Sequence, residues 1–310
     1  MHIPDGFLDG KTAAATAVLS VAALVAATRQ AKQKLHRRQV PMMGLAAAFV
    51  FTAQMINFPV AAGTSGHLMG SVLVSVLLGP GPAIIVMTAV LTVQALLFAD
   101  GGLLSLGANV FNMAVLGTTG GVAVYALLSR MMKGERGMLV ASGVGAWCSI
   151  VLASVACAGE LAWSGTASWE TVFPAMALVH MVIGFGEALI TVLVLAAILV
   201  SRPELLAAPP GSGTGHAWFI YAGLATVGLV LFVSPFASPW PDGLEKVASA
   251  LGFESRALAV PLAPHPLADY MVPGIGSPAL ATALAGVVGT VVVFVFSFVL
   301  ARVVLSRSKS

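Results

Sequence analysis

The sequence begins with Met1-His2, a dipeptide whose nitrogen atoms could chelate a metal ion. If the terminus is free, its amine, the deprotonated amide between the two residues and the His2 imidazole can close two fused chelate rings. His67, in the glycine-rich segment AAGTSGHLMG, could supply a fourth nitrogen. Four nitrogens in a plane suit Ni(II) or Cu(II), and also low-spin Co(II), whereas zinc prefers a tetrahedron and magnesium prefers oxygen. Met1, His2 and His67 are therefore a candidate metal site.

Polar residues flank this candidate site in the sequence. Thr64 and Ser65 precede His67 and could orient the ligands through hydrogen bonds. Gln54 and Asn57, three residues apart on a preceding helix, could hydrogen-bond the N-terminal segment. Alternatively, such polar residues hold neighbouring helices together. Spacing alone leaves this cluster as one plausible site among several.

His180 and Glu187 form a second candidate group, because seven residues place them about two helical turns apart on one face. Ionisable side chains inside a membrane are a functional hypothesis by default. The pair could serve coupling or an ion path, or it could hydrogen-bond neighbouring helices. Three other histidines have no partner at ligand spacing. His36 is expected in a solvated basic cluster with Lys34, Arg37 and Arg38, and His216 and His265 are expected at interfaces or in loops.

The composition is that of a membrane protein. Of 310 residues, 58% are hydrophobic and 9% are charged, with a mean hydropathy of +0.98, whereas soluble domains carry about 25% charged residues. Nucleic acid is not expected as a partner. Cys148 and Cys157 lie in an apolar stretch and are expected to be small buried residues. No Lys or Arg precedes Lys11, so no cleaved signal peptide is expected and Met1 should be retained.

Nine apolar segments are expected to form membrane-spanning helices: 12–29, 42–58, 67–78, 83–99, 107–130, 138–158, 173–200, 217–233 and 280–304. The short third segment ends at LGPGP, which breaks a helix. With the N-terminus outside and nine crossings, every Lys and Arg except Lys11, Lys246 and Arg256 falls on the cytoplasmic side. This segregation is typical of membrane proteins and supports nine crossings.

The expected fold is an all-α integral membrane protein, with a seven-helix substrate-binding bundle followed by a two-helix accessory unit. We expect the first unit at residues 1–200, a cytoplasmic linker at 201–215 and the second unit at 216–310. A proline-rich outer loop, residues 234–277, separates the last two helices, and Gly243 to Phe253 could form an amphipathic helix within it.

Several motifs resemble one known family. MHIPDGFL, the segments Ala46 to Gly70 and Gln94 to Met113, and HMVIGFGEALIT resemble the NikM/CbiM family of substrate-specificity subunits of energy-coupling factor (ECF) transporters for nickel and cobalt. Residues Ser234 to Phe253 resemble the PDGLE domain of the small NikN-like accessory subunit, fused here to the first unit. The resemblance implies that the terminal amine, the amide nitrogen, His2 and His67 hold the metal.

The resemblance also implies an ABC importer of the ECF type in a prokaryotic cell (inner) membrane, with the N-terminus outside and the C-terminus cytoplasmic. Its partners would be a transmembrane coupling (T) subunit and cytoplasmic ATPase (A) subunits, because this chain lacks a GxxxxGK[ST] motif. The metal would be transported Ni(II) or Co(II) rather than a cofactor, with nickel favoured by the PDGLE-type unit.

Other readings remain open. A cobalt-specific component that supplies cobalamin synthesis is one, and a self-sufficient secondary cation transporter, which would usually show inverted repeats, is another. An intramembrane metalloprotease would be expected to carry HExxH, which is absent from this sequence.

Overall fold

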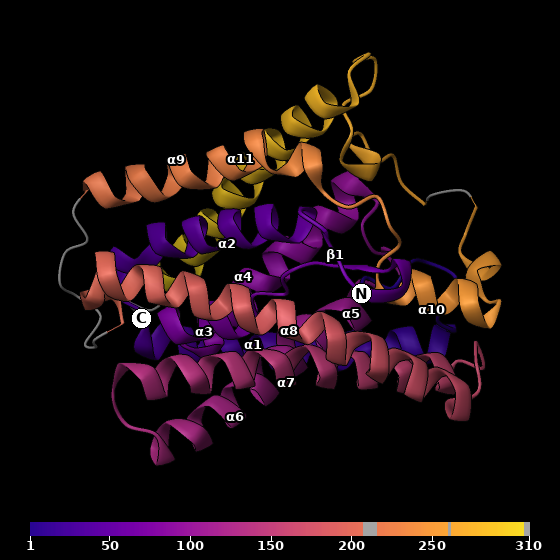
Figure 1. The fold of residues 1–310 in the computed structure, drawn as a ribbon, viewed down its shortest axis with the longest axis horizontal. Coiled ribbons are helices and arrows are strands. Elements are labelled where there is room, and N and C mark those ends of the chain that lie inside the picture. The colour runs from indigo at the N-terminus through magenta and orange to yellow at the C-terminus, as the bar shows by residue number, and fades with distance from the viewer. Residues whose placement is uncertain (207–215, 260–261, 307–310) are drawn as a thin grey trace.

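The protein is a bundle of long, roughly parallel helices (Figure 1). The computed structural model describes residues 1–206, 216–259 and 262–306. The first unit contains α1 (Gly10–Lys34), α2 (Val40–Met55), β1 (Phe58–Pro59), β2 (Ser65–Gly66), α3 (Ser71–Leu78), α4 (Pro80–Val93), α5 (Leu106–Asn109), α6 (Gly117–Met131), α7 (Gly134–Trp163) and α8 (Trp169–Ser201). The second contains α9 (His216–Phe232), α10 (Gly243–Leu251) and α11 (Pro278–Ser306).

Two segments of wider, π-helical turns continue these helices. Residues Gln94–Phe98 extend α4, and Val110–Leu116 join α5 to α6. Such turns are frequent at functional sites. Here they flank the connection from Ala99 to Ser105, which packs against the N-terminal segment.

Apolar surface surrounds the described part of the bundle, as expected for a protein in lipid. Seven of the described helical segments are long and apolar enough to cross a membrane. Many of their large apolar side chains are exposed, including Phe185 on α8 at 69% and Leu224 on α9 at 62%. The expectation of an all-α integral membrane protein is confirmed.

Two of the expected membrane helices are shorter than the sequence suggested. α2 has 16 residues and α3 only 8. The expectation of a helix from residue 67 is wrong, because residues 65 and 66 are strand and Gly70, with a φ of +82°, precedes the first turn of α3. Non-helical backbone is tolerated at membrane depth only when protein surrounds it, and every residue from Thr64 to Ser75 is buried.

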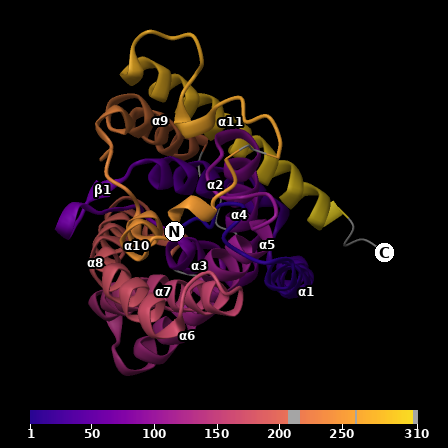
Figure 2. The same ribbon diagram turned by 90° about the vertical axis from the view of Figure 1, so that its right-hand side faces the viewer.

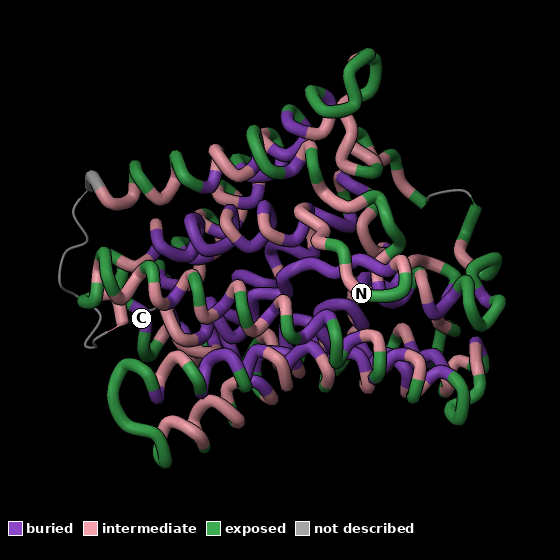
Figure 3. The backbone as a smooth tube through the Cα atoms, in the orientation of Figure 1, coloured by how far each residue is buried: buried purple, intermediate pink, exposed green. Residues whose placement is uncertain are grey.

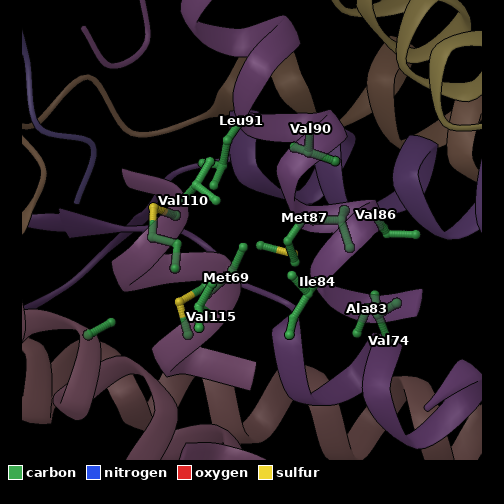
Figure 4. Packing of buried hydrophobic residues seen from close by; sticks show 14 of the residues in the cluster. Met69, Val74, Ala83, Ile84, Val86, Met87, Val90, Leu91, Val110 and Val115 are labelled. Atoms are coloured by element: carbon green, nitrogen blue, oxygen red, sulfur yellow. The ribbon is translucent and has the colours of Figure 1, made fainter. Parts of the chain in front are cut away.

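The core lies around α4 and is filled with small and flexible apolar side chains. Figure 3 shows the buried residues concentrated in the middle of the molecule. The close view in Figure 4 shows Met87 and Ile84 of α4 near Met69 and Val115. α4 begins at Pro80, where Gly79 has a φ of +89°, so the LGPGP sequence separates α3 from α4 as expected.

The second unit packs on the first through α11 and α2. The hydroxyls of Thr52 and Thr290 lie 3.0 Å apart, and a Cβ on Gly289 would approach the Phe51 ring to 2.2 Å. Small residues let membrane helices approach closely. Figure 2 shows α9 and α11 together on one side of the bundle, with α10 beside the N-terminus.

The connection between α9 and α11 reaches the N-terminal segment of the chain. Asp242 caps the first turn of α10, since its Oδ1 accepts a hydrogen bond from the Glu245 amide, and Gly252, with a φ of +77°, caps the other end. The expected amphipathic helix therefore forms, two residues shorter than its expected end at Phe253. Its first turn lies next to Met1 (Figure 1).

Candidate metal centre

The first three residues are folded into the protein interior. Met1, His2 and Ile3 are all buried. Asn109 on α5 holds Ile3 with two hydrogen bonds: its Oδ1 accepts from the Ile3 amide at 2.8 Å, and its Nδ2 donates to the Ile3 carbonyl at 3.0 Å. Because both bonds go to main-chain atoms, Asn109 fixes the direction in which the chain terminus points.

Asp5 anchors the same N-terminal segment two residues after Ile3. Its carboxylate accepts hydrogen bonds from three consecutive amides, those of Leu103, Leu104 and Ser105, at 2.8 to 3.1 Å. A carboxylate in such a nest of amides is strongly held. The N-terminal segment is therefore docked on the connection between α4 and α5.

His67 lies in the extended segment between β2 and α3, which is held from two helices. The Glu187 carboxylate on α8 accepts hydrogen bonds from the amides of Met69 at 2.5 Å and Gly70 at 2.9 Å. Gln54 Nε2 on α2 donates to the Met69 carbonyl at 2.9 Å. These bonds satisfy main-chain groups that no helix or long sheet satisfies here.

Gln54 and Asn57 make hydrogen bonds to two other segments of the chain. Gln54 bonds Met69, and the Asn57 carbonyl accepts a bond from the amide of Ser238 in the second unit. Thr64 is buried, and its carbonyl accepts a hydrogen bond from the Val60 amide.

Ser65 and the second unit are joined directly. The Ser65 hydroxyl donates to the Trp240 carbonyl at 2.7 Å, and the Ser65 amide donates to the Pro241 carbonyl at 2.8 Å. These hydrogen bonds of Ser65 therefore tie the segment before His67 to the second unit. The next residue, Asp242, reaches the chain terminus, because its Oδ2 accepts a hydrogen bond from the Met1 amine at 2.6 Å.

The three candidate ligands meet, although they are separated by 66 positions in the sequence. The Met1 amine lies 3.3 Å from His67 Nε2, and the His2 and His67 rings are stacked with centroids 5.2 Å apart. His67 Nδ1 lies 3.2 Å from the Leu68 carbonyl, so a proton on Nδ1 can be donated there and leaves the Nε2 lone pair free.

The His2 ring is oriented by two further residues. Its Nδ1 lies 2.9 Å from the Asp100 carboxylate, which also accepts a 2.5 Å hydrogen bond from the Tyr270 hydroxyl of the second unit. In the chelate, Nδ1 is the ring nitrogen that closes the six-membered ring. Chelation therefore requires the imidazole to exchange Asp100 for the metal.

The two carboxylates make the centre favourable for positive charge. Burial opposes ionisation of Asp242 and Asp100, yet the Met1 ammonium and the His2 ring hold their pKa values well below the usual range. Burial lowers the pKa of the Met1 amine, but the Asp242 carboxylate outweighs it and raises that pKa. A divalent cation that replaces the ammonium proton would find both carboxylates charged.

His180 and Glu187 have different neighbours, although they lie on the same helix. Both side chains are buried on α8, but Glu187 holds the His67 segment, whereas His180 lies next to Gly243 and near Met1. His265 is half-buried in the connection between α9 and α11, with Nδ1 3.2 Å from the Leu96 carbonyl. The side chain of His216 lies outside the described residues.

Sequence reasoning missed Asn109, Asp100, Asp242 and Tyr270. Each acts across about 100 residues or more. The available signal was the position of Asp100 and Asn109 in the segment Gln94 to Met113, and of Asp242 in the PDGLE motif. Among the described residues no three His, Cys, Asp or Glu side chains have metal-binding spacing, so a four-ligand site here needs main-chain nitrogens.

Comparison with known proteins divides the chain into two matched regions. Residues 2–205 match the family described as "Cobalt uptake substrate-specific transmembrane region", and residues 216–306 match the PDGLE domain. A crystal structure of a truncated transition metal transporter is similar, with a TM-score of 0.59 and 35% identity over 64% of this chain and 99% of that chain.

Similar relatives include one that covers nearly all of this chain and one that covers a smaller part of it. A "Putative fused nickel transport protein NikMN" from Archaeoglobus fulgidus is 35% identical and covers 97% of this chain and 98% of its own. "Cobalt transport protein CbiM 1" from Pelobacter propionicus is 32% identical and covers 70% of this chain and 98% of its own.

Proposed function

Since the chain belongs to the family of cobalt uptake substrate-specific transmembrane regions and is a membrane component of nickel and cobalt transport, we propose that it captures the ion for an ECF-type ABC importer. The ion is Ni(II) or Co(II), and it is bound as substrate by the Met1 amine, the amide and imidazole of His2, and His67. The observation that carries this proposal is the 3.3 Å approach of the Met1 amine to His67 Nε2.

The site chemistry favours capture over catalysis. Four nitrogens around one ion leave no equatorial position for a second reactant, so the site suits binding and release. The ammonium and the amide each lose a proton when they bind the ion, and metal binding in general competes with protons. Release into the cell would therefore follow from movement or reprotonation of these ligands.

Partners are needed to drive transport. The sequence has no GxxxxGK[ST] phosphate loop. We propose that a transmembrane T subunit and cytoplasmic A subunits supply the energy, in a prokaryotic cell membrane. The N-terminus lies outside, because that orientation keeps most Lys and Arg cytoplasmic. Arg307 and Lys309, part of that charge count, lie outside the described residues.

We also propose three segments for the chain, with the binding unit at residues 1–200, a linker at 201–215 and the PDGLE-type unit at 216–310. Most of that linker, 207–215, lies outside the described residues. Nickel is favoured over cobalt because the similar NikMN chain from Archaeoglobus fulgidus, which spans both units, is named for nickel transport.

The first test is uptake of labelled nickel and cobalt by cells that express this chain with and without T and A subunits. We expect accumulation only with all components, and nickel in preference to cobalt. Equal uptake by the chain alone would instead identify a self-sufficient transporter, and cobalt preference would identify the cobalt-specific alternative.

The chelate itself is tested at the chain terminus. A chain acetylated at its terminus has an amide in place of the Met1 amine, so we expect nickel binding to be lost while the protein still inserts. Nickel titration of the purified chain measures this. His67→Ala should weaken binding and His265→Ala should not. Tight binding by the acetylated chain would exclude the chelate.

A further inference from the structure

A small cavity lies beside the candidate centre and does not include His2. Its volume is about 10 Å³, and its lining includes the Met1, His67, His180 and Asp242 residues. This is room for one water-sized guest. The rest of the lining is largely apolar and includes Met69 and Met113.

His180 is the unexplained residue of this cavity. Its side chain is 1% exposed, and its Nε2 has no hydrogen-bond partner in the part of the chain that the structure describes. A buried polar atom without a partner is costly, and in a native structure it needs an explanation. The proposed chelate does not use this atom, and neither do the hydrogen bonds by which Glu187 holds the His67 segment.

The other ring nitrogen of His180 prepares Nε2 to accept a ligand. Nδ1 lies 2.7 Å from the Met176 carbonyl one turn earlier on α8, so Nδ1 carries the proton and donates it there. Nε2 then carries the lone pair. A histidine that donates one ring N–H to a carbonyl while its second nitrogen faces an ion is the usual arrangement of a metal ligand.

The second unit closes the cavity on the outer side. Gly243, which follows Asp242, packs so closely on His180 that a Cβ there would lie 2.8 Å from Nε2. A glycine at this position leaves the approach to Nε2 open. Asp242 adds a carboxylate to the same wall, which favours a cation as the guest over a neutral molecule.

We propose that His180 is a further metal ligand: an ion in this cavity binds its Nε2 together with the Met1 amine and His67 Nε2. This three-nitrogen set is a second holding position beside the planar chelate. It needs no deprotonated amide and no His2, and the ammonium proton leaves to solvent as the ion binds. A cation can therefore bind there before the chelate forms, or after the His2 ring and amide have let it go.

This inference rests on the proposed function, and the two are tested separately with the purified full-length chain and Ni(II) or Co(II) alone. Wild-type protein should show the spectrum of planar, diamagnetic Ni(II); if it binds neither ion, the proposed function itself fails. His2→Ala removes the chelate but not the second position. We expect it to retain weaker binding with a paramagnetic, non-planar Ni(II) signature.

The deciding comparison adds His180→Ala to His2→Ala. The remaining affinity should fall at least about tenfold, since even an outer-shell partner of a metal ligand is worth that much. His180→Ala alone should keep the planar nickel spectrum, and His265→Ala in the His2→Ala background should change nothing. No remaining binding in His2→Ala, or remaining binding that His180→Ala leaves unchanged, would overturn the proposal.

A second variant covers the case in which the buried His180→Ala chain does not fold. Gly243→Ala places a methyl group against Nε2 from the other side of the cavity, and it leaves His180 in place. In the His2→Ala background it should also lower the remaining affinity. If it does not, His180 is not a ligand.

Discussion

At the scale of single residues, side chains at this centre mainly position main-chain atoms. Asn109 holds the amide and carbonyl of Ile3, Asp5 holds three amides after α4, and Glu187 holds two amides beside His67. A ligand set that uses the chain terminus needs this control, because a free terminus is otherwise among the least ordered parts of a protein.

Glu187→Gln tests this control. Glutamine offers one oxygen where the carboxylate offers two, so one of the Met69 and Gly70 amides loses its acceptor and faces an NH2 group. We expect the free energy of unfolding to fall by about 1–3 kcal/mol, and nickel affinity to fall with it. Thermal unfolding and nickel titration in detergent measure both.

The matched control is Glu170→Gln, since Glu170 is exposed in the first turn of the same helix. It should leave both quantities unchanged. If Glu187→Gln behaves like this control, Glu187 does not hold the His67 segment.

At the scale of elements, the centre lies where β2, α8 and α10 come together. β2 carries the segment leading to His67, and Gly66 on it packs directly on α8: a Cβ there would lie 2.5 Å from Ile183 Cγ2. α10 adds its capped first turn from the other unit. β2 thus lies this close to α8 because residue 66 is a glycine, which has no side chain.

Gly66→Ala should therefore push β2 away from α8. We expect a lower melting temperature and weaker nickel binding, because the overpacked segment shifts His67. Adding Ile183→Ala should restore part of both by removing the atoms in conflict. Gly228→Ala on α9, where a Cβ meets nothing within 4 Å, serves as the control and should be neutral. Failure of Ile183→Ala to rescue would contradict the packing argument.

At the scale of the whole molecule, the two units share both an interior and a site. α11 packs along α2, and the connection between α9 and α11 places Asp242 on the Met1 amine and Tyr270 on Asp100. The second unit is thus part of the environment of the candidate centre, and its contribution does not require the peptide link between the units.

A chain split within residues 207–215 should consequently reassemble. When the two parts are co-expressed, we expect them to purify together from membranes by a tag on one part. Gly289→Leu should abolish this association, because the side chain would overlap Phe51 and Phe98. Gly223→Leu on α9, where a Cβ meets nothing within 4 Å, should not. Association that survives Gly289→Leu would mean that the units are held elsewhere.

The sequence alone determined the class of the fold and the candidate ligands. Apolar length and charge segregation are properties of local segments, so they predicted the helices, their approximate limits and the break at LGPGP. Chelation by Met1 and His2 depends on two adjacent residues, which is why a linear sequence could suggest it, and the short helix α3 was misjudged because an apolar run does not distinguish helix from buried extended chain.

Only the tertiary structure decided which distant groups meet at that centre. Four contacts at the centre join residues so far apart in the sequence that no local pattern encodes them: Asn109 with Ile3, Asp100 with His2, Asp242 with Met1, and Tyr270 with Asp100. The hydrogen-bond partners of Gln54 and Ser65 also came only from the fold, because such bonds depend on helix rotation and packing. His180 and Glu187 share one face of α8, yet different segments pack on the two turns that carry them. Glu187 accepts hydrogen bonds from the Met69 and Gly70 amides, whereas His180 lines a cavity.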